Sequence, residues 1–137
     1  MKKDLPVNLV EDISIAVVLE SATPDSKNWT VYLINEKDVD LTNVLVSSKG
    51  YGLKDGREVK TTTLRHFLGD VPANAAVQIE VIDTQVFGLT NEYWLSYYIE
   101  NTIYDKKYIF LPESIVDENL SKVPFVNKPG VIIGGNN

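Results

Sequence analysis

The sequence predicts an all-β protein, an antiparallel two-layer β-sandwich of about seven strands. Two observations predict it: apolar and polar residues alternate over short runs, as in half-buried strands, and turn-forming residues separate these runs at intervals of about 8–12 residues. A chain of 137 residues has the usual size of one domain. We therefore expect a single domain over residues 1–137, with a core at about 12–111 and a tail at 112–137.

The first two strands are predicted at residues 12–20 and 29–35. Aliphatic residues alternate in the first run, and a segment rich in turn-forming residues (21–28) ends it. The second run carries apolar side chains on both faces, which indicates a central strand rather than an edge strand.

A third strand is predicted at residues 41–48 and a fourth at 59–68. Three consecutive threonines favour extended structure in the fourth run, because a branched β-carbon suits a strand. The glycines of 50–56 lie between the two runs and are expected in turns. They lack the G-K-[ST] ending of a phosphate loop and the third glycine of a dinucleotide fingerprint.

The clearest alternation of the chain lies at residues 75–83. It predicts that the aliphatic side chains point inward and the polar ones outward, namely Val77, Ile79 and Val81 inward and Gln78 and Glu80 outward. Glu80 and Asp83, or Glu92 and Glu100, have the residue types of an acid–base pair, but Glu80 lies on the polar face of its strand, where a solvated charge is expected.

The last two strands, around residues 93–99 and 108–111, form a predicted hairpin that turns at 105–107. Side chains alternate across a strand, so Tyr93 and Tyr97 share one face, and Trp94 and Tyr98 the other, where we also place Tyr104. Only one face can line the core, and Tyr and Trp are enriched in binding hot spots. The second face is then covered by the C-terminal tail or by a partner. The candidate binding residues are Tyr93, Trp94, Tyr97, Tyr98, Tyr104 and Tyr108.

The tail is predicted to hold one short helix or to be irregular. Ser114 and Asp117 have the spacing of a capping box, which favours a helix at 114–120. From Val123 onward prolines and glycines are frequent, and an irregular segment is expected.

Composition disfavours several classes of function. The chain has no cysteine, which excludes disulfides, thiolate nucleophiles and cysteine-ligated metals. Its formal charge of −6 and its scattered basic residues disfavour binding to the polyanionic nucleic acids. No run approaches the ~18 apolar residues of a membrane-spanning helix. We expect a cytoplasmic protein that contacts neither nucleic acid nor membrane.

His66 is the only histidine, so a general base or imidazole ligand would have to be this residue. It shares a strand face with Leu64 and Leu68, which predicts a buried core histidine; the alternative is a polar site with Arg65. Asp70 is close in sequence but lies past a turn, and the G-x-S-x-G motif of a nucleophile elbow is absent. We expect no catalytic residue, no metal and no cofactor.

Two stretches resemble immunoglobulin-like accessory domains of bacterial proteins over about residues 12–111, and this resemblance implies an immunoglobulin-like sandwich. They are the strand end at Asn35 followed by Leu41-x-x-Val44-x-Val46, and residues 68–72 followed by the strand of Val77, Ile79 and Val81.

The chain also resembles a small family of uncharacterised bacterial proteins. The resemblance lies at residues 48–52, 63–67 and 104–108. Some members carry a phenylalanyl-tRNA synthetase label, but an aminoacylation domain needs a larger ATP-binding sheet and several arginines, and this chain has two. The resemblance therefore implies a family and not that activity.

Three functions follow as hypotheses, in this order. The first is a non-catalytic protein-interaction module, as a homodimer or with another protein, that uses the aromatic hairpin or a sheet edge. The second is a small-molecule or carbohydrate-binding protein with a pocket lined by Tyr and Trp. The third is an enzyme centred on His66, which requires an exposed imidazole with a partner carboxylate.

Overall fold

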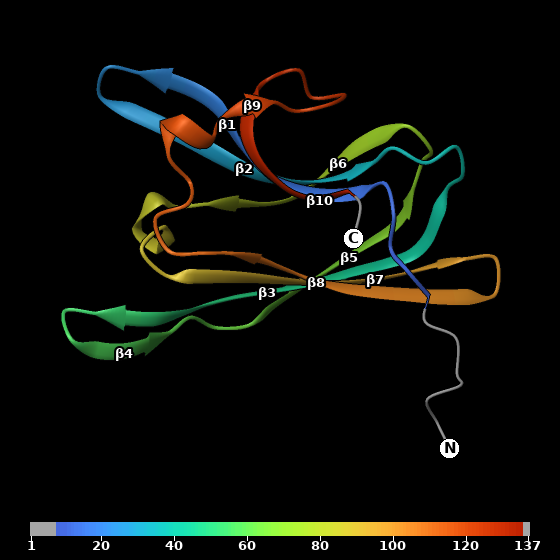
Figure 1. The fold of residues 1–137 in the computed structure, drawn as a ribbon, viewed down its shortest axis with the longest axis horizontal. Helices are drawn as coiled ribbons and strands as arrows, with labels where there is room; N and C mark the ends of the chain where they lie inside the picture. The colour runs from blue at the N-terminus through green and yellow to red at the C-terminus, as the bar shows by residue number, and fades with distance from the viewer. Residues whose placement is uncertain (1–7, 136–137) are drawn as a thin grey trace.

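Two antiparallel sheets pack face to face in the computed structural model, which describes residues 8–135 (Figure 1). Sheet A has the strand order β6-β2-β1-β10-β9, and sheet B the order β4-β3-β7-β8, with β5 also paired to β3. The strands of sheet A are β1 (Ile13–Thr23), β2 (Ser26–Asn35), β6 (Ala75–Ile82), β9 (Ser121–Lys122) and β10 (Pro129–Gly135). Those of sheet B are β3 (Leu41–Lys54), β4 (Arg57–Lys60), β5 (Leu64–Val71), β7 (Thr90–Ile99) and β8 (Thr102–Phe110).

The predicted fold class is confirmed, since the protein is an all-β sandwich of two antiparallel sheets. The part of the chain that the structure describes has ten strands rather than about seven. One reason is that the predicted fourth strand is divided at Thr61. Its hydroxyl accepts a hydrogen bond from the Gly50 amide, and its own amide donates to the Gly50 carbonyl, both at 2.8 Å. After this break the chain pairs again with β3 as β5.

The tail is more regular than predicted. β10 pairs with β1, with Ile133 opposite Ile15, so the prediction of an irregular tail is wrong. The predicted helix is only a 3-10 turn, η3 (Asp117–Asn119). The capping box does not form, because the Ser114 hydroxyl donates to the Leu111 carbonyl instead.

The loop between β9 and β10 covers the outer face of sheet A. Val123 and Val126 pack there against apolar side chains that point away from the main core, including Val18 and Ile34. The tail therefore shields the outer face of sheet A, and it does so through a second, small apolar cluster.

The main core lies between the sheets and combines aliphatic side chains with buried aromatic rings from β7 and β8. Tyr108 of sheet B crosses the core, and its hydroxyl donates to the Ile13 carbonyl of sheet A at 2.7 Å. Gly134 makes room for this ring, since a β-carbon at Gly134 would overlap it.

β6 contains a β-bulge that changes the direction of its side chains. Two consecutive residues of β2 lie opposite Gln78 and Glu80, so Ile79 between them has no partner. An extra residue reverses the alternation of the side chains that follow it. The predicted orientations are therefore wrong beyond the bulge: Val81 is 72% exposed, whereas Glu80 points into the sandwich.

Candidate functional site

The predicted aromatic hairpin is β7 and β8, but the predicted turn at 105–107 is wrong: Ile99 pairs with Thr102, so the chain turns at Glu100 and Asn101, and residues 105–107 lie within β8. Tyr93 and Tyr97 are buried in the core, and Trp94 and Tyr98 lie on the outer face of sheet B, as the alternation predicts. Tyr104 was predicted to lie with Trp94, and this is wrong. It is the register partner of Tyr97, and the two rings stack with centroids 5.2 Å apart.

Of the six candidate aromatic residues, only Trp94 and Tyr98 therefore present their rings on the outer face of sheet B. Tyr108 is fully buried, as Tyr93 and Tyr97 are. Phe67, which the sequence did not single out, joins the outer pair from β5, because it shares a face with Leu45 of β3. We call Phe67, Trp94 and Tyr98 the aromatic patch.

The aromatic patch is exposed, with Phe67 at 69% and Trp94 at 46%. The C-terminal segment was one of the two expected covers for this face, but it lies on sheet A instead. β7 itself is a central strand of sheet B and lies between β3 and β8. No segment within residues 8–135 covers the patch as the β9–β10 loop covers sheet A.

Basic side chains flank Trp94. Arg65, Ser47, Trp94 and Lys107 form one transverse row over β5, β3, β7 and β8, and Nζ of Lys107 lies 5.1 Å from the indole centroid. A groove of about 300 Å³ runs beside the indole and includes Arg65. Neither Arg65 nor Lys107 forms an ion pair with another residue in the described range 8–135.

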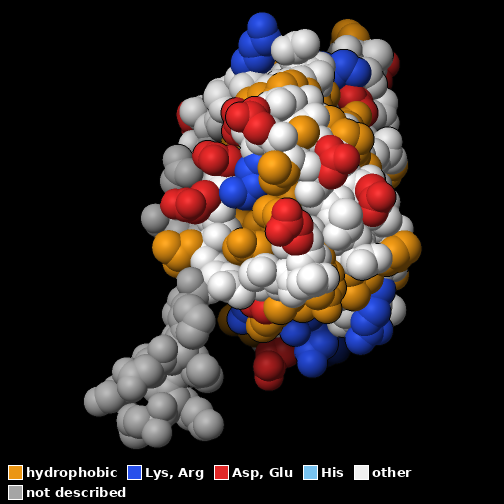
Figure 2. Space-filling model, turned by 90° about the vertical axis from the view of Figure 1, so that its right-hand side faces the viewer, with side chains coloured by type: hydrophobic (Ala, Val, Ile, Leu, Met, Phe, Trp, Pro, Cys, Tyr) orange, Lys and Arg blue, Asp and Glu red, His pale blue; other side chains and the backbone are white. Residues whose placement is uncertain are grey.

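The carboxylate in this groove is already engaged. Glu92 lies 3.7 Å from Nζ of Lys49 and accepts a hydrogen bond from the Tyr51 hydroxyl at 3.1 Å. Burial, and then this hydrogen bond, raise the pKa of Tyr51. Figure 2 views the molecule from the end at the right of Figure 1, and there hydrophobic, basic and acidic side chains lie along the lower margin, on the side of sheet B.

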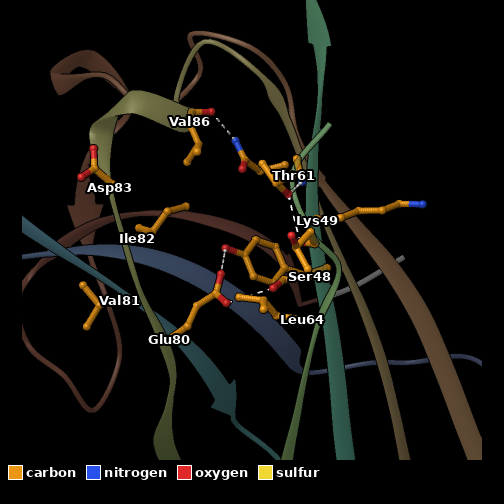
Figure 3. A pocket seen from close by; sticks show the side chains of 13 residues that line it. Ser48, Lys49, Thr61, Leu64, Glu80, Val81, Ile82, Asp83 and Val86 are labelled. Atoms are coloured by element: carbon orange, nitrogen blue, oxygen red, sulfur yellow. Dashed lines mark hydrogen bonds between the residues drawn. The ribbon is translucent and has the colours of Figure 1, made fainter. Parts of the chain in front are cut away.

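A second group of polar residues lies inside the sandwich, around Glu80 (Figure 3). Its Oε1 lies 2.9 Å from the Ser48 hydroxyl, which donates to it, and 2.7 Å from Nε2 of His66, while Oε2 accepts from the Tyr93 hydroxyl at 2.8 Å. The Glu80 side chain is 13% exposed. Burial and the nearby charge of Glu80 raise the pKa of Tyr93, so the phenol stays neutral and donates.

The structure changes the interpretation of His66. It is half-buried and paired with Glu80, a carboxylate that the sequence assigned to solvent, rather than with Asp70. Arg65 lies on the opposite face of β5, so the predicted polar site of His66 and Arg65 does not form.

No helix among the described residues is long and apolar enough to cross a membrane.

The Glu80 cluster lacks the connectivity of a hydrolytic triad. In a triad the imidazole takes the proton of the serine and a carboxylate orients the imidazole. Here Ser48 and His66 both bond to the carboxylate, and within the described chain no hydrogen bond joins them. Residues 8–135 also hold no group of three or more His, Asp or Glu side chains placed to bind a metal.

Sequence reasoning missed Ser48 and placed Glu80 on the wrong face of its strand. Ser48 could have been found, because it continues the inward-facing series of Val44 and Val46. A polar side chain at such a buried position needs a hydrogen-bond partner. The direction of Glu80 could not have been found, because it depends on the bulge at Ile79.

Comparison with models of protein families finds no match to this chain, and a search of curated proteins finds no relative. The resemblance to the bacterial family of uncharacterised proteins therefore stays a prediction.

Proposed function

We propose that the protein is a non-catalytic binding module that docks a protein partner on the outer face of sheet B, with Trp94 as its anchor. The observation that carries this proposal is the contrast between the two outer faces. The chain covers the apolar outer face of sheet A with Val123 and Val126, whereas Phe67 and Trp94 stay exposed on sheet B. Large exposed apolar groups that lie together mark interaction surfaces, and Trp and Arg are favoured in their centres.

The charges around Trp94 favour an acidic partner. Arg65 and Lys107 flank the indole and form no ion pair among the described residues, Glu92 is engaged by Lys49, and Asp105 lies one row farther along β8, opposite Ser96. A segment with Asp or Glu beside an apolar side chain would complement this row. In a twofold dimer the same patch meets itself, so these cations would face each other. We therefore favour an acidic partner over the homodimer.

The test is fluorescence anisotropy with two labelled peptides, one of alternating acidic residues and Phe, and one in which Lys replaces every acid. We expect saturable, salt-sensitive binding of the acidic peptide alone, and a loss of about tenfold or more in affinity for Trp94→Ser and for Arg65→Glu. Val81→Ser is the matched control, because it also removes an exposed apolar side chain, but from sheet A. Equal binding of both peptides, or full binding by Trp94→Ser, contradicts the proposal.

Light scattering across a wide concentration range separates the two occupants. We expect a monomer. A dimer that Trp94→Ser dissociates would support self-association and overturn the acidic partner.

Two finer predictions belong to the same proposal. We infer an immunoglobulin-like sandwich, because β1, β2 and β6 share one sheet and β3, β7 and β8 the other, the arrangement of strands A, B, E and C, F, G in that fold. We also infer a cytoplasmic location, which the absence of cysteine supports.

A further inference from the structure

A cavity of about 260 Å³ lies between the two sheets, where β5 and β6 form neighbouring edges (Figure 3). Glu80 reaches it from β6, and Ser48 and Tyr93 reach it from sheet B. Thr61 and Thr62, from the break between β4 and β5, also line it. The bulge that turns Glu80 into this cavity is a feature that commonly re-aims side chains at functional sites.

The hydrogen-bond donors on the Glu80 side of the cavity are already used. The hydroxyls of Ser48 and Tyr93 both donate to the Glu80 carboxylate. Their oxygens keep free lone pairs, and Oε2 of Glu80, with one bond from Tyr93, can accept another. This side therefore offers acceptors to a ligand.

The side-chain donors of Asn91 and Thr61, on the opposite side of the cavity, are used as well. The side-chain amide of Asn91 donates to the carbonyls of Val86 and Leu89, which leaves its Oδ1 as an acceptor. The Thr61 hydroxyl donates to the Thr62 carbonyl. A ligand that bonds to the oxygens of Glu80, Asn91 and Thr61 must bring the hydrogens itself.

The charged side chains that line the cavity also favour a ligand that donates hydrogen bonds. Glu80 and Asp83 both line the cavity. Lys49 also borders it, but its side chain points away, as Figure 3 shows, and its ammonium lies 3.7 Å from Glu92 on the outer face of sheet B. Nε2 of His66 lies 2.7 Å from Oε1 of Glu80, but His66 is not among the residues that line the cavity, so the lining favours a cation over a neutral molecule or an anion.

Aliphatic side chains complete the lining, with Leu64, Ile82 and Val86 suited to an alkyl stem. The volume is below the roughly 300–1,000 Å³ of sites for drug-sized ligands. We propose that this cavity binds a small alkylammonium or alkylguanidinium group, whose N–H groups donate to Glu80. The site is independent of the proposed docking surface, because it lies on the core side of β3 and β7, whereas the aromatic patch lies on their outer side.

The test is an amide ¹H–¹⁵N NMR titration of the whole chain with four probes of similar stem: n-butylammonium, n-butyltrimethylammonium, n-butanol and n-butyrate. We expect saturable shifts at Gly50 and Asn91 with n-butylammonium, and binding about tenfold or more weaker for the trimethylated cation, which has the charge but no N–H group. Butanol or butyrate binding as well as the amine overturns the proposal, as does the absence of saturable shifts. This probe series uses the unmutated protein, so it tests the proposal even if a variant fails to fold.

Glu80→Gln should lower the affinity for n-butylammonium by about tenfold or more. Glu92→Gln is the matched control, since it makes the same change at a second buried carboxylate that faces away from the cavity. Unchanged affinity in Glu80→Gln, or an equal loss in Glu92→Gln, contradicts the assignment. A capped Gly-Lys-Gly peptide identifies the source: binding comparable to butylammonium indicates a lysine side chain of a protein, and binding of butylammonium alone indicates a free amine. Both results require the Glu80 site.

Discussion

Nε2 of His66 lies 2.7 Å from Oε1 of Glu80, and this contact joins the two sheets of the sandwich. Glu80 belongs to β6 of sheet A, whereas His66, Ser48 and Tyr93 belong to three strands of sheet B. The carboxylate thus makes three polar contacts across the interface between the sheets, and in two of them Ser48 and Tyr93 donate. A polar contact of this kind fixes the distance and register of the sheets, which apolar packing alone specifies less strictly.

Replacement of Glu80 by Ala should therefore destabilise the protein by about 2–3 kcal/mol, because Ser48, His66 and Tyr93 all lose their hydrogen-bond partner in a half-buried site. The measurement is the urea midpoint, compared with Glu92→Ala on the outer face of sheet B, where Lys49 and Tyr51 are nearer to solvent. A smaller loss for Glu80→Ala than for Glu92→Ala would show that the cluster does not hold the sheets together.

Two buried tyrosines of β7 should respond oppositely to loss of the hydroxyl. Tyr93 donates to Glu80, so Tyr93→Phe should cost about 1–2 kcal/mol. The Tyr97 hydroxyl is buried without a hydrogen-bond partner among the described residues, so Tyr97→Phe should be neutral or stabilise by up to about 1 kcal/mol. Thermal and urea unfolding of the two variants compare them directly. Equal losses would mean that Tyr97 has a polar partner, such as an ordered water.

The contact between β1 and the tail loop should make stability depend on acid pH. Glu20 accepts hydrogen bonds from Lys128 at 2.8 Å and Tyr32 at 2.6 Å, and these lower its pKa, the Lys128 bond most. A carboxyl whose pKa is lower when folded stabilises the fold above its unfolded pKa, and this contribution is lost as the pH falls through the folded value. Tyr32, whose pKa is raised to about 12 chiefly by the same bond, stays neutral throughout.

The stability of the native protein should therefore exceed that of Glu20→Gln at pH 7, and the difference should disappear in acid below the folded pKa of Glu20. We expect a difference below about 1 kcal/mol, because the contact is partly exposed. Urea unfolding of both proteins from pH 7 to pH 3 measures it. A difference that is constant with pH would contradict the assigned coupling.

Gly134→Ala should destabilise the sandwich more than Gly56→Ala. Both glycines have positive φ, +104° and +78°, so both substitutions carry a backbone cost of roughly 1–2 kcal/mol. At Gly56 the new β-carbon meets open space, whereas at Gly134 it overlaps the Tyr108 ring, which adds about 1–3 kcal/mol. Thermal unfolding of the two variants measures the difference, and equal costs would mean that the ring moves aside freely.

The sequence predicts the fold class well and the site poorly, for physical reasons. Hydrophobic alternation reports which strands exist and which face of each is apolar, so the division of β7 into buried Tyr93 and exposed Trp94 was predictable. A β-bulge leaves no comparable mark. Ile79 is apolar and continues the alternation, although its extra place in β6 reverses the direction of Glu80 and Val81.

Pairing across a turn was a second source of error. Tyr104 faces the core because the register places it opposite Tyr97, and the sequence of the hairpin did not fix that register. In the tail, prolines and glycines predicted irregular structure, but Gly130 and Gly134 are needed for close packing of β10 against Val17 and Tyr108. The same residues that break isolated strands are here a condition of tertiary contact.

β10 pairs with β1 but is synthesised long after it. β1 can pair with β2 as soon as both have left the ribosome, but its other edge stays open until residues 129–135 are synthesised. During this interval Val18 and Ile34 also lack the cover of the β9–β10 loop. A nascent chain at this stage presents an unpaired strand edge beside an apolar surface, the combination that most readily aggregates. The period between the synthesis of β2 and that of β10 is therefore the one in which this edge and this surface are open to wrong contacts.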